Sequence, residues 1–184
     1  TVLLGGKRLR PLLTYLMADL FNLSRDEISL YANAIEWVHS ASLAHDDVID
    51  MATTRRGRPS INCVAGNKKS ILAGDYLLGH TIKKLSARGN LDLVLEMSKI
   101  IEQLALGEWL QSDAAIDRTY SREIITQIAH NKTASVMSWC CVAPAILVDL
   151  PLEIVEKCRE LGVHLGLAFQ LKDDILDFSG GAYK

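Results

Sequence analysis

Helix breakers are scarce in this chain, and their scarcity limits the folds that it can adopt. The 184 residues include only four prolines and twelve glycines. Between these residues, apolar side chains recur every three or four positions and do not alternate, which is the spacing of a helix with one buried face. We therefore predict an all-α protein, folded as a bundle of long helices with short connections.

The boundaries of several helices can be predicted. Ser24 and Glu27 have the spacing of a capping box, in which both side chains satisfy backbone amides of the first turn. From Ile28 the apolar spacing continues without a breaker to Asp46, and Gly57 with Pro59 indicates a loop over residues 53–60. Further helices are predicted over about residues 68–87, 91–112, 121–148 (bent or broken near Pro144) and 152–178.

Length and composition exclude several classes of protein. The 184 residues, 49% of them hydrophobic and 23% charged, suit one compact domain and form a short chain for two. A net charge of −2 gives no general basic surface for nucleic acid. The longest uncharged stretch, residues 133–148, is shorter than the roughly 20 apolar residues of a spanning helix. We therefore expect neither nucleic-acid binding nor a transmembrane segment.

The cysteines do not indicate a disulfide framework. No C-x-x-C pair occurs, and adjacent cysteines are poor disulfide partners for each other. We expect all four to be reduced and most of them buried, as in a reducing compartment. They are Cys63, Cys140, Cys141 and Cys158.

The pattern D-D-x-x-D occurs twice, each time among apolar residues. The two copies comprise Asp46, Asp47 and Asp50, and Asp173, Asp174 and Asp177. Helical residues are about 100° apart, so the first and last aspartates of each copy share one face and the middle one points away. His39 lies on the face of Asp46, and Gln170 lies within about 60° of Asp173.

Two such aspartate pairs favour a bound cation. Like charges one turn apart repel and weaken a helix, which calls for a compensating charge. Carboxylate ligands without cysteine or suitably spaced histidine select a hard ion, and Mg²⁺ fits best because it leaves coordination positions for phosphates. The alternative, two solvated helix faces, is disfavoured by the repetition and by the apolar surroundings.

Basic residues complement the aspartates. Residues 5–11 (GGKRLRP) and 55–58 (RRGR) each cluster cations beside glycine, and a guanidinium binds phosphate oxygens bidentately. Together with the metal they suggest one or two phosphorylated ligands, although either cluster alone would suit ordinary surface solubility. Lys132, within an apolar helical stretch, either faces an anion or extends to solvent. His45 adjoins the first motif and is a candidate to support it.

In their order and spacing, these motifs resemble the signature of trans-isoprenyl diphosphate synthases, the head-to-tail polyprenyl transferases. The matching segments are GGKRLRP, HSASLAHDDVID followed by RRGRPS, Lys132-Thr133, and FQLKDDILDF. The resemblance implies an isoprenoid-synthase bundle around a central apolar cavity, with the two aspartate motifs facing each other at its mouth. It also implies that residues 1–184 form a single catalytic domain, incomplete at both ends.

The resemblance assigns a role to each matching residue. Three Mg²⁺ ions would be ligated by Asp46, Asp50 and Asp173, with Asp47, Asp174 and Asp177 supporting them directly or through water. The allylic diphosphate would be held by Arg55, Lys132, Thr133 and Gln170. Isopentenyl diphosphate would be held by Lys7, Arg10, His39 and Arg56.

The implied reaction is head-to-tail prenyl transfer, which lengthens an allylic diphosphate by one isopentenyl unit. In this family a bulky aromatic side chain four or five positions before the first aspartate ends the product early. Ser42 and Ala41 are small, so we expect a product of C20 or longer, for isoprenoid or quinone side-chain synthesis. Trp37, Val38 and residues 71–78 are candidates for the floor of the cavity.

Two alternatives and two questions stay open. A class I terpene cyclase also uses a D-D-x-x-D motif, but it normally replaces the second aspartate motif and needs no isopentenyl site. A non-catalytic regulatory subunit would be expected to have lost one motif. The resemblance implies a homodimer, with a heteromer as the alternative, and an intracellular protein whose compartment is either cytoplasmic or mitochondrial.

Overall fold

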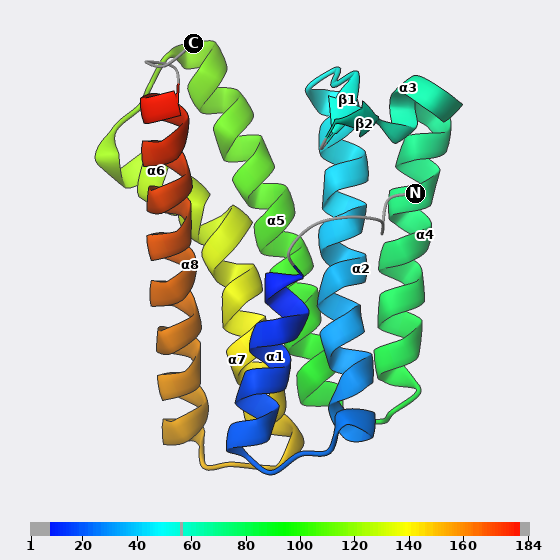
Figure 1. Ribbon diagram of the computed structural model, residues 1–184, viewed down its shortest axis with the longest axis vertical. Coiled ribbons are helices and arrows are strands. Elements are labelled where there is room, and N and C mark those ends of the chain that lie inside the picture. Colours follow the sequence, from blue (N-terminus) through cyan, green and yellow to red (C-terminus); the bar gives the residue numbers. More distant parts are fainter. Residues whose placement is uncertain (1–7, 56, 181–184) are drawn as a thin grey trace. The chain divides into compact units, whose positions relative to one another are not determined.

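The computed structural model describes residues 8–55 and 57–180, with side chains described as far as residue 176 (Figure 1). It confirms the all-α fold class, since one two-stranded hairpin accompanies the helices in the described part. The elements are α1 (Leu9–Leu20), α2 (Arg25–Ile49), β1 (Thr54–Arg55), β2 (Arg58–Pro59), α3 (Ile61–Ala65), α4 (Asn67–Ser86), α5 (Leu91–Asp117), α6 (Arg122–Ala129), the π-helical turn His130–Ala134, α7 (Ser135–Leu147) and α8 (Leu152–Gly180). Among these described helices, none is both long and apolar enough to cross a membrane.

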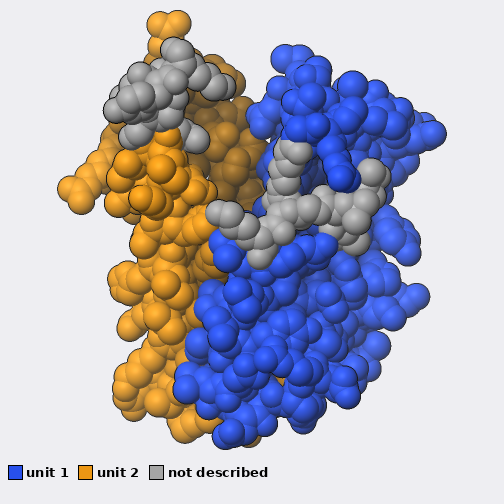
Figure 2. All heavy atoms as spheres, in the orientation of Figure 1, with its two compact units in different colours: residues 1–94 blue, residues 95–184 orange. Residues whose placement is uncertain are grey.

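The chain divides into two compact units, residues 1–94 and residues 95–184 (Figure 2). Each unit has its own close-packed helices. That residues 1–184 act as a single catalytic domain stays a prediction.

In the first unit, α2 is the central element and packs against α1 and α4. The predicted capping box is confirmed: the Ser24 amide donates to Glu27 Oε2 at 2.8 Å, and the Glu27 amide donates to Ser24 Oγ at 3.3 Å. Ile28, Ile35 and Val38 are fully buried at helical spacing along α2. This buried face continues to the C-terminal end of α2, where the first aspartate motif lies.

His45 faces α4 and not the aspartates. Its Nε2 lies 3.1 Å from the carbonyl oxygen of Ile71 and 3.3 Å from Asp75 Oδ1. The helices approach so closely here that a Cβ added at Gly74 would lie 2.2 Å from His45 Nε2. The prediction that His45 supports the first motif is therefore corrected: these two polar contacts join α2 to α4.

In the second unit, α7 packs against α8, and every α7 residue from 135 to 145 is buried. The prediction of one helix over residues 121–148, bent near Pro144, is wrong about the position of the break. The irregularity is the π-helical turn at His130–Ala134, whereas α7 continues past Pro144 to Leu147.

Most of the remaining boundaries agree closely with prediction, and the differences lie within residues 53–65, where α3 was not predicted, and at the end of α5. Residues 53–60 contain the hairpin β1–β2, in which Gly57 adopts a left-handed conformation at φ 73°. Helix α5 continues to Asp117 because no breaker interrupts it. All four cysteines are free; Cys63 is exposed and the other three are buried, and burial raises the pKa of Cys141 to about 12.

Candidate active site

The first aspartate motif lies at the C-terminal end of α2, as its spacing predicted. The Asp50 amide donates to the Asp46 carbonyl at 2.8 Å, so these two residues stay in helical register one turn apart. Asp46 is half-buried and Asp50 is exposed. Their carboxylates are thus carried on one face of the helix end.

Asp47 lies apart from this face, also as predicted. Its side chain is buried, and its Oδ1 accepts a hydrogen bond of 2.7 Å from Arg55 Nε on strand β1. Among the described residues, this is the bond that the Arg55 guanidinium makes, through one of its three nitrogens. Asp47 therefore fixes Arg55 beside the motif and leaves the two terminal nitrogens of the guanidinium for another acceptor.

The segment between α2 and α3 is held to the helix end by two residues that the sequence motifs did not single out. Asn62 Nδ2 donates to the carbonyl oxygens of Asp47 at 2.9 Å and of Ala52 at 3.0 Å. Ser60 Oγ donates to the same Ala52 oxygen at 2.7 Å. Met51 takes a left-handed conformation at φ 51°, which turns the chain at the end of the helix. These bonds hold the segment from the hairpin to α3 against the C-terminal end of α2.

In the second unit, Lys132 is paired with acceptors from α5. Its ammonium group forms an ion pair with Glu108, and it donates to Gln111 Oε1 at 3.0 Å. Of the two fates predicted for this lysine, the structure shows the one in which it faces an anion. Glu108 and Gln111 were not among the predicted site residues, although two polar residues three apart in the window QLALGEWLQ are a usable signal.

Thr133 and Gln170 are brought together by α8. Thr133 Oγ1 donates to Gln170 Oε1 at 2.7 Å, and Gln170 Nε2 donates to Asp174 Oδ1 at 2.8 Å. Gln170 thus bonds to Asp174, one turn farther along α8. The half-buried Asp173 lies beside this chain of hydrogen bonds.

The other predicted residues lie on α1 and α2 or outside the described part of the chain. Arg10, in the first turn of α1, and His39 are half-buried, and the His39 carbonyl accepts a bond of 3.0 Å from Ser42 Oγ. Ala41 is fully buried. Lys7, Arg56 and the side chain of Asp177 lie outside the described residues.

The described acidic residues do not form a complete metal site by themselves. Among the described residues, no three His, Cys, Asp or Glu side chains lie together in a way that could hold an ion alone. A pair of carboxylates per motif nevertheless suits Mg²⁺, which is commonly held by one or two carboxylates together with substrate phosphates. The donor chemistry of the motifs therefore fits Mg²⁺ bound with a phosphorylated ligand.

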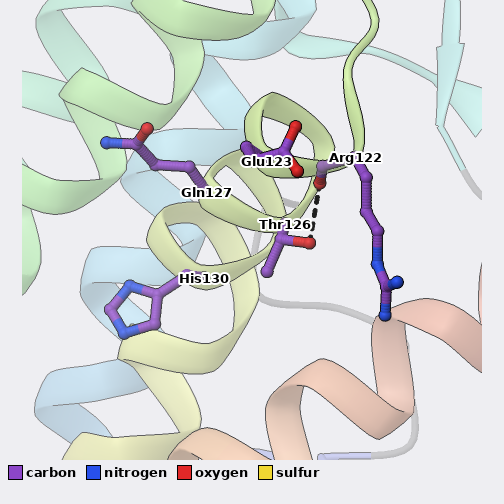
Figure 3. A pocket seen from close by; sticks show the side chains of 5 residues that line it. All are labelled: Arg122, Glu123, Thr126, Gln127 and His130. Atoms are coloured by element: carbon purple, nitrogen blue, oxygen red, sulfur yellow. Dashed lines mark hydrogen bonds between the residues drawn. The ribbon is translucent and has the colours of Figure 1, made fainter.

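A surface hollow of about 520 Å³ lies along α6 (Figure 3). Its walls include a hydrogen bond of 2.8 Å from Thr126 Oγ1 to the Arg122 carbonyl. The lining residues are Arg122, Glu123, Thr126, Gln127 and His130. None of these is a predicted site residue, so the hollow does not form part of the candidate site.

Comparisons with known proteins cover nearly the whole chain. Residues 1–184 match the family model described as polyprenyl synthetase. Mitochondrial solanesyl-diphosphate synthase 1 of Oryza sativa subsp. japonica is 41% identical over 95% of this chain and 45% of its own sequence. The crystal structure of a decaprenyl diphosphate synthase from Rhodobacter capsulatus matches with a TM-score of 0.90 and 36% identity, covering 94% of this chain and 53% of that one.

A third relative was crystallised with ligands. The polyprenyl synthase of Caulobacter crescentus, complexed with calcium and isoprenyl diphosphate, matches with a TM-score of 0.89 and 34% identity, over 95% of this chain and 53% of that one. The chain described here spans about half the length of each of these relatives.

Proposed function

The chain belongs to the polyprenyl synthetase family, and from this premise we propose that it takes part in Mg²⁺-dependent head-to-tail prenyl transfer. In this reaction isopentenyl diphosphate condenses with an allylic diphosphate to give a longer trans-polyprenyl diphosphate. One observation carries the proposal. Each aspartate motif has a polar side chain held beside it by a hydrogen bond, and we assign these two side chains to phosphate binding: Arg55 on Asp47, and Gln170 on Asp174.

Three Mg²⁺ ions are proposed to be held by Asp46, Asp50 and Asp173, with support from Asp47, Asp174 and Asp177. Bound there, the ions would neutralise negative charge that develops on a departing diphosphate. The exposed Asp50 and the half-buried Asp46 and Asp173 are accessible enough to contribute oxygen ligands. The calcium and isoprenyl diphosphate in the Caulobacter crescentus relative agree with a divalent metal in this family.

The allylic diphosphate is proposed to contact Arg55, Lys132, Thr133 and Gln170. The terminal nitrogens of Arg55 present a planar pair of donors that suits phosphate oxygens. Lys132 has three N–H donors, of which Glu108 and Gln111 engage two. These fixed charges and dipoles stabilise the diphosphate as the allylic C–O bond breaks, and they need little reorganisation to do so.

The second substrate, isopentenyl diphosphate, is proposed to be bound by Lys7, Arg10, His39 and Arg56. Its double bond attacks the allylic cation, forming the new C–C bond, and loss of one proton yields the new allylic double bond. The departing diphosphate is the proposed base, because the site residues include no side chain that is evidently placed for that task.

The product is proposed to be C20 or longer, because the helix face before Asp46 carries small residues. Ala41 and Ser42 occupy the positions at which a bulky side chain would end the product early. The next aromatic residue towards the N-terminus, Trp37, packs edge-on against His80, with 4.9 Å between the ring centroids. The solanesyl and decaprenyl synthases among the relatives agree with a long product. A single catalytic domain and a homodimer, or alternatively a heteromer, complete the proposal.

A substrate-omission assay distinguishes the alternatives. Purified protein is incubated with Mg²⁺, labelled isopentenyl diphosphate and farnesyl or geranylgeranyl diphosphate, and the products are sized. Elongation that requires both substrates supports prenyl transfer. Hydrocarbon formed from the allylic diphosphate alone indicates a terpene cyclase, and turnover of neither substrate combination indicates a regulatory subunit; either result overturns the proposal.

A further inference from the structure

The π-helical turn His130–Ala134 interrupts the regular α-helical hydrogen bonding, and the proposed function assigns it no role. Its defining bond joins the Ser135 amide to the carbonyl oxygen of His130, five residues earlier. An α-helix would instead join the Ser135 amide to Asn131, so the turn accommodates one more residue. Such turns are rare and often lie at functional sites. This one contains both Lys132 and Thr133.

The two residues of the turn are directed to different helices. Lys132 bonds to Glu108 and Gln111 on α5, whereas Thr133 bonds to Gln170 on α8. One additional residue in a helix rotates all the later residues about the helix axis by about 100°. The turn therefore determines where these two side chains lie relative to the buried face of α7.

The Ser135 side chain replaces the backbone hydrogen-bond donor that the π-helical turn takes from the Asn131 carbonyl. Because the Ser135 amide bonds to His130, the Asn131 carbonyl loses the donor that it would have in an α-helix. The Ser135 hydroxyl donates to that carbonyl at 2.6 Å, and Ser135 is only 2% exposed. A partly buried carbonyl that loses its amide donor is costly, so this hydroxyl offsets part of the cost of the wide turn.

Two glycines allow the neighbouring helices α5 and α8 to approach the turn closely. A Cβ at Gly166 on α8 would lie 2.4 Å from Ala134 Cα, and one at Gly107 on α5 would lie 2.7 Å from Lys132 Cγ. Neither neighbouring helix could approach the turn as closely with a side chain at these positions. The hydroxyl of Ser135 and the glycine contacts thus act on the same five residues from different sides.

We infer that Ser135 is a positioning residue for the allylic diphosphate site, acting through the π-helical turn, and that Gly166 is a second one. Ser135 is not assigned a contact with either substrate; it keeps Lys132 and Thr133 where the diphosphate requires them. The inference rests on the proposed function, because the proposed function assigns Lys132 and Thr133 to the allylic diphosphate site.

The test compares matched variants of the purified protein. Ser135→Ala is compared with Ser138→Ala, which removes the hydroxyl of another buried serine from α7 but not from the turn. Gly166→Ala is compared with Gly162→Ala, whose Cβ would be equally crowded, 2.5 Å from Ser138 Cα, but beyond the turn. The second pair keeps the test decisive if Ser135→Ala does not fold.

The readout is the KM of each substrate, together with the affinity for inorganic pyrophosphate in the presence of Mg²⁺. For Ser135→Ala and Gly166→Ala, we expect the KM of the allylic diphosphate and the Kd of pyrophosphate to rise roughly tenfold, about the effect of one or two misplaced hydrogen bonds. The KM of isopentenyl diphosphate should stay within about twofold, which a general loss of structure would not allow.

Each outcome is decisive. Unchanged allylic KM in both test variants, or an equal rise in the two controls, overturns the inference while leaving prenyl transfer in place. A wild-type protein that binds no pyrophosphate and elongates no substrate overturns the proposed function, and the inference with it.

Discussion

Arg55 and the buried Asp47 form an ion pair across the connection from α2 to strand β1, with Arg55 Nε 2.7 Å from Asp47 Oδ1. Asp47, the middle aspartate of the first motif, therefore binds the first arginine of the basic cluster at residues 55–58. This relationship links two features that are separate in the sequence, the aspartates and the basic cluster that comes after them. The ion pair also gives these two residues a structural role, beside the role in the reaction that we propose for them.

Replacing Arg55 is expected to lower the free energy of unfolding. Arg55→Ala leaves the Asp47 carboxylate buried without its cation, and we expect a loss of about 1–2 kcal/mol, moderated because Arg55 itself is partly exposed. The exposed Arg58 is the control, and Arg58→Ala should change the value by less than about 0.5 kcal/mol. Urea unfolding at neutral pH measures both. Equal stability of the two variants would show that the ion pair does not hold the loop.

Removing the Thr133 hydroxyl is expected to impair catalysis more than folding. Thr133→Val keeps the shape of the side chain but removes the donor to Gln170. We expect kcat/KM for the allylic diphosphate to fall roughly tenfold, the effect of about one hydrogen bond to a charged or positioned group. Thr126→Val on α6 removes an exposed hydroxyl and should stay within about twofold of wild type. A wild-type kcat/KM for Thr133→Val would remove Thr133 from the site.

Bulky residues before the first motif are expected to shorten the product. Ser42→Phe and Ala41→Phe each replace a small side chain before the first motif with an aromatic ring. Because Ala41 is fully buried, Ala41→Phe should also cost about 1–3 kcal/mol of stability through overpacking, which makes the half-buried Ser42 the cleaner position. Asn33→Phe, at an exposed position of the same helix, is the control. If product sizing shows that Ser42→Phe makes a product of wild-type length, this helix face does not determine product length.

The pH dependence of stability should reveal the buried ion pair between α5 and α8. Burial raises the pKa of Glu96, but hydrogen bonds from Arg159 and Lys99 outweigh burial, so its net pKa lies below the ordinary glutamate value of 4.5. A carboxylate whose pKa is lowered on folding contributes stability above its unfolded pKa and loses it as pH falls through the folded pKa.

Glu96→Gln is therefore expected to be less stable than wild type at pH 7, and the difference should shrink below about pH 4.5. Urea midpoints measured from pH 7 to pH 3 follow this difference. Glu153→Gln, at an exposed i,i+4 pair with Lys157, is the control and should show little difference at any pH. A difference between Glu96→Gln and wild type that stays constant to pH 3 would contradict the assignment.

The parts of the structure that depend on local spacing were predictable from the sequence. The capping box at Ser24, the helical register of Asp46 and Asp50, and the separate direction of Asp47 follow from rotation per residue and from short-range hydrogen bonds. Each of these features needs only residues close together in the chain, so no knowledge of packing is required.

The parts that depend on tertiary contacts were not predictable. The break at His130–Ala134 carries no glycine or proline, and Pro144 was a stronger local signal for a break elsewhere. The partners of Lys132 come from α5, more than twenty residues earlier, and those of His45 come from α4. Such contacts are decided by which helices pack together, which periodicity alone does not specify.

The central claim, that both aspartate motifs serve one prenyl transfer reaction, is tested most directly by the rate of isopentenyl incorporation in two single variants. Asp46→Ala and Asp173→Ala are assayed with Mg²⁺ and both diphosphates, with Asp113→Ala, an exposed aspartate of α5, as the control. We predict that each motif variant loses about two orders of magnitude or more in rate, because each removes a proposed metal ligand, whereas the control keeps the wild-type rate. Elongation at the wild-type rate in both motif variants would contradict the claim.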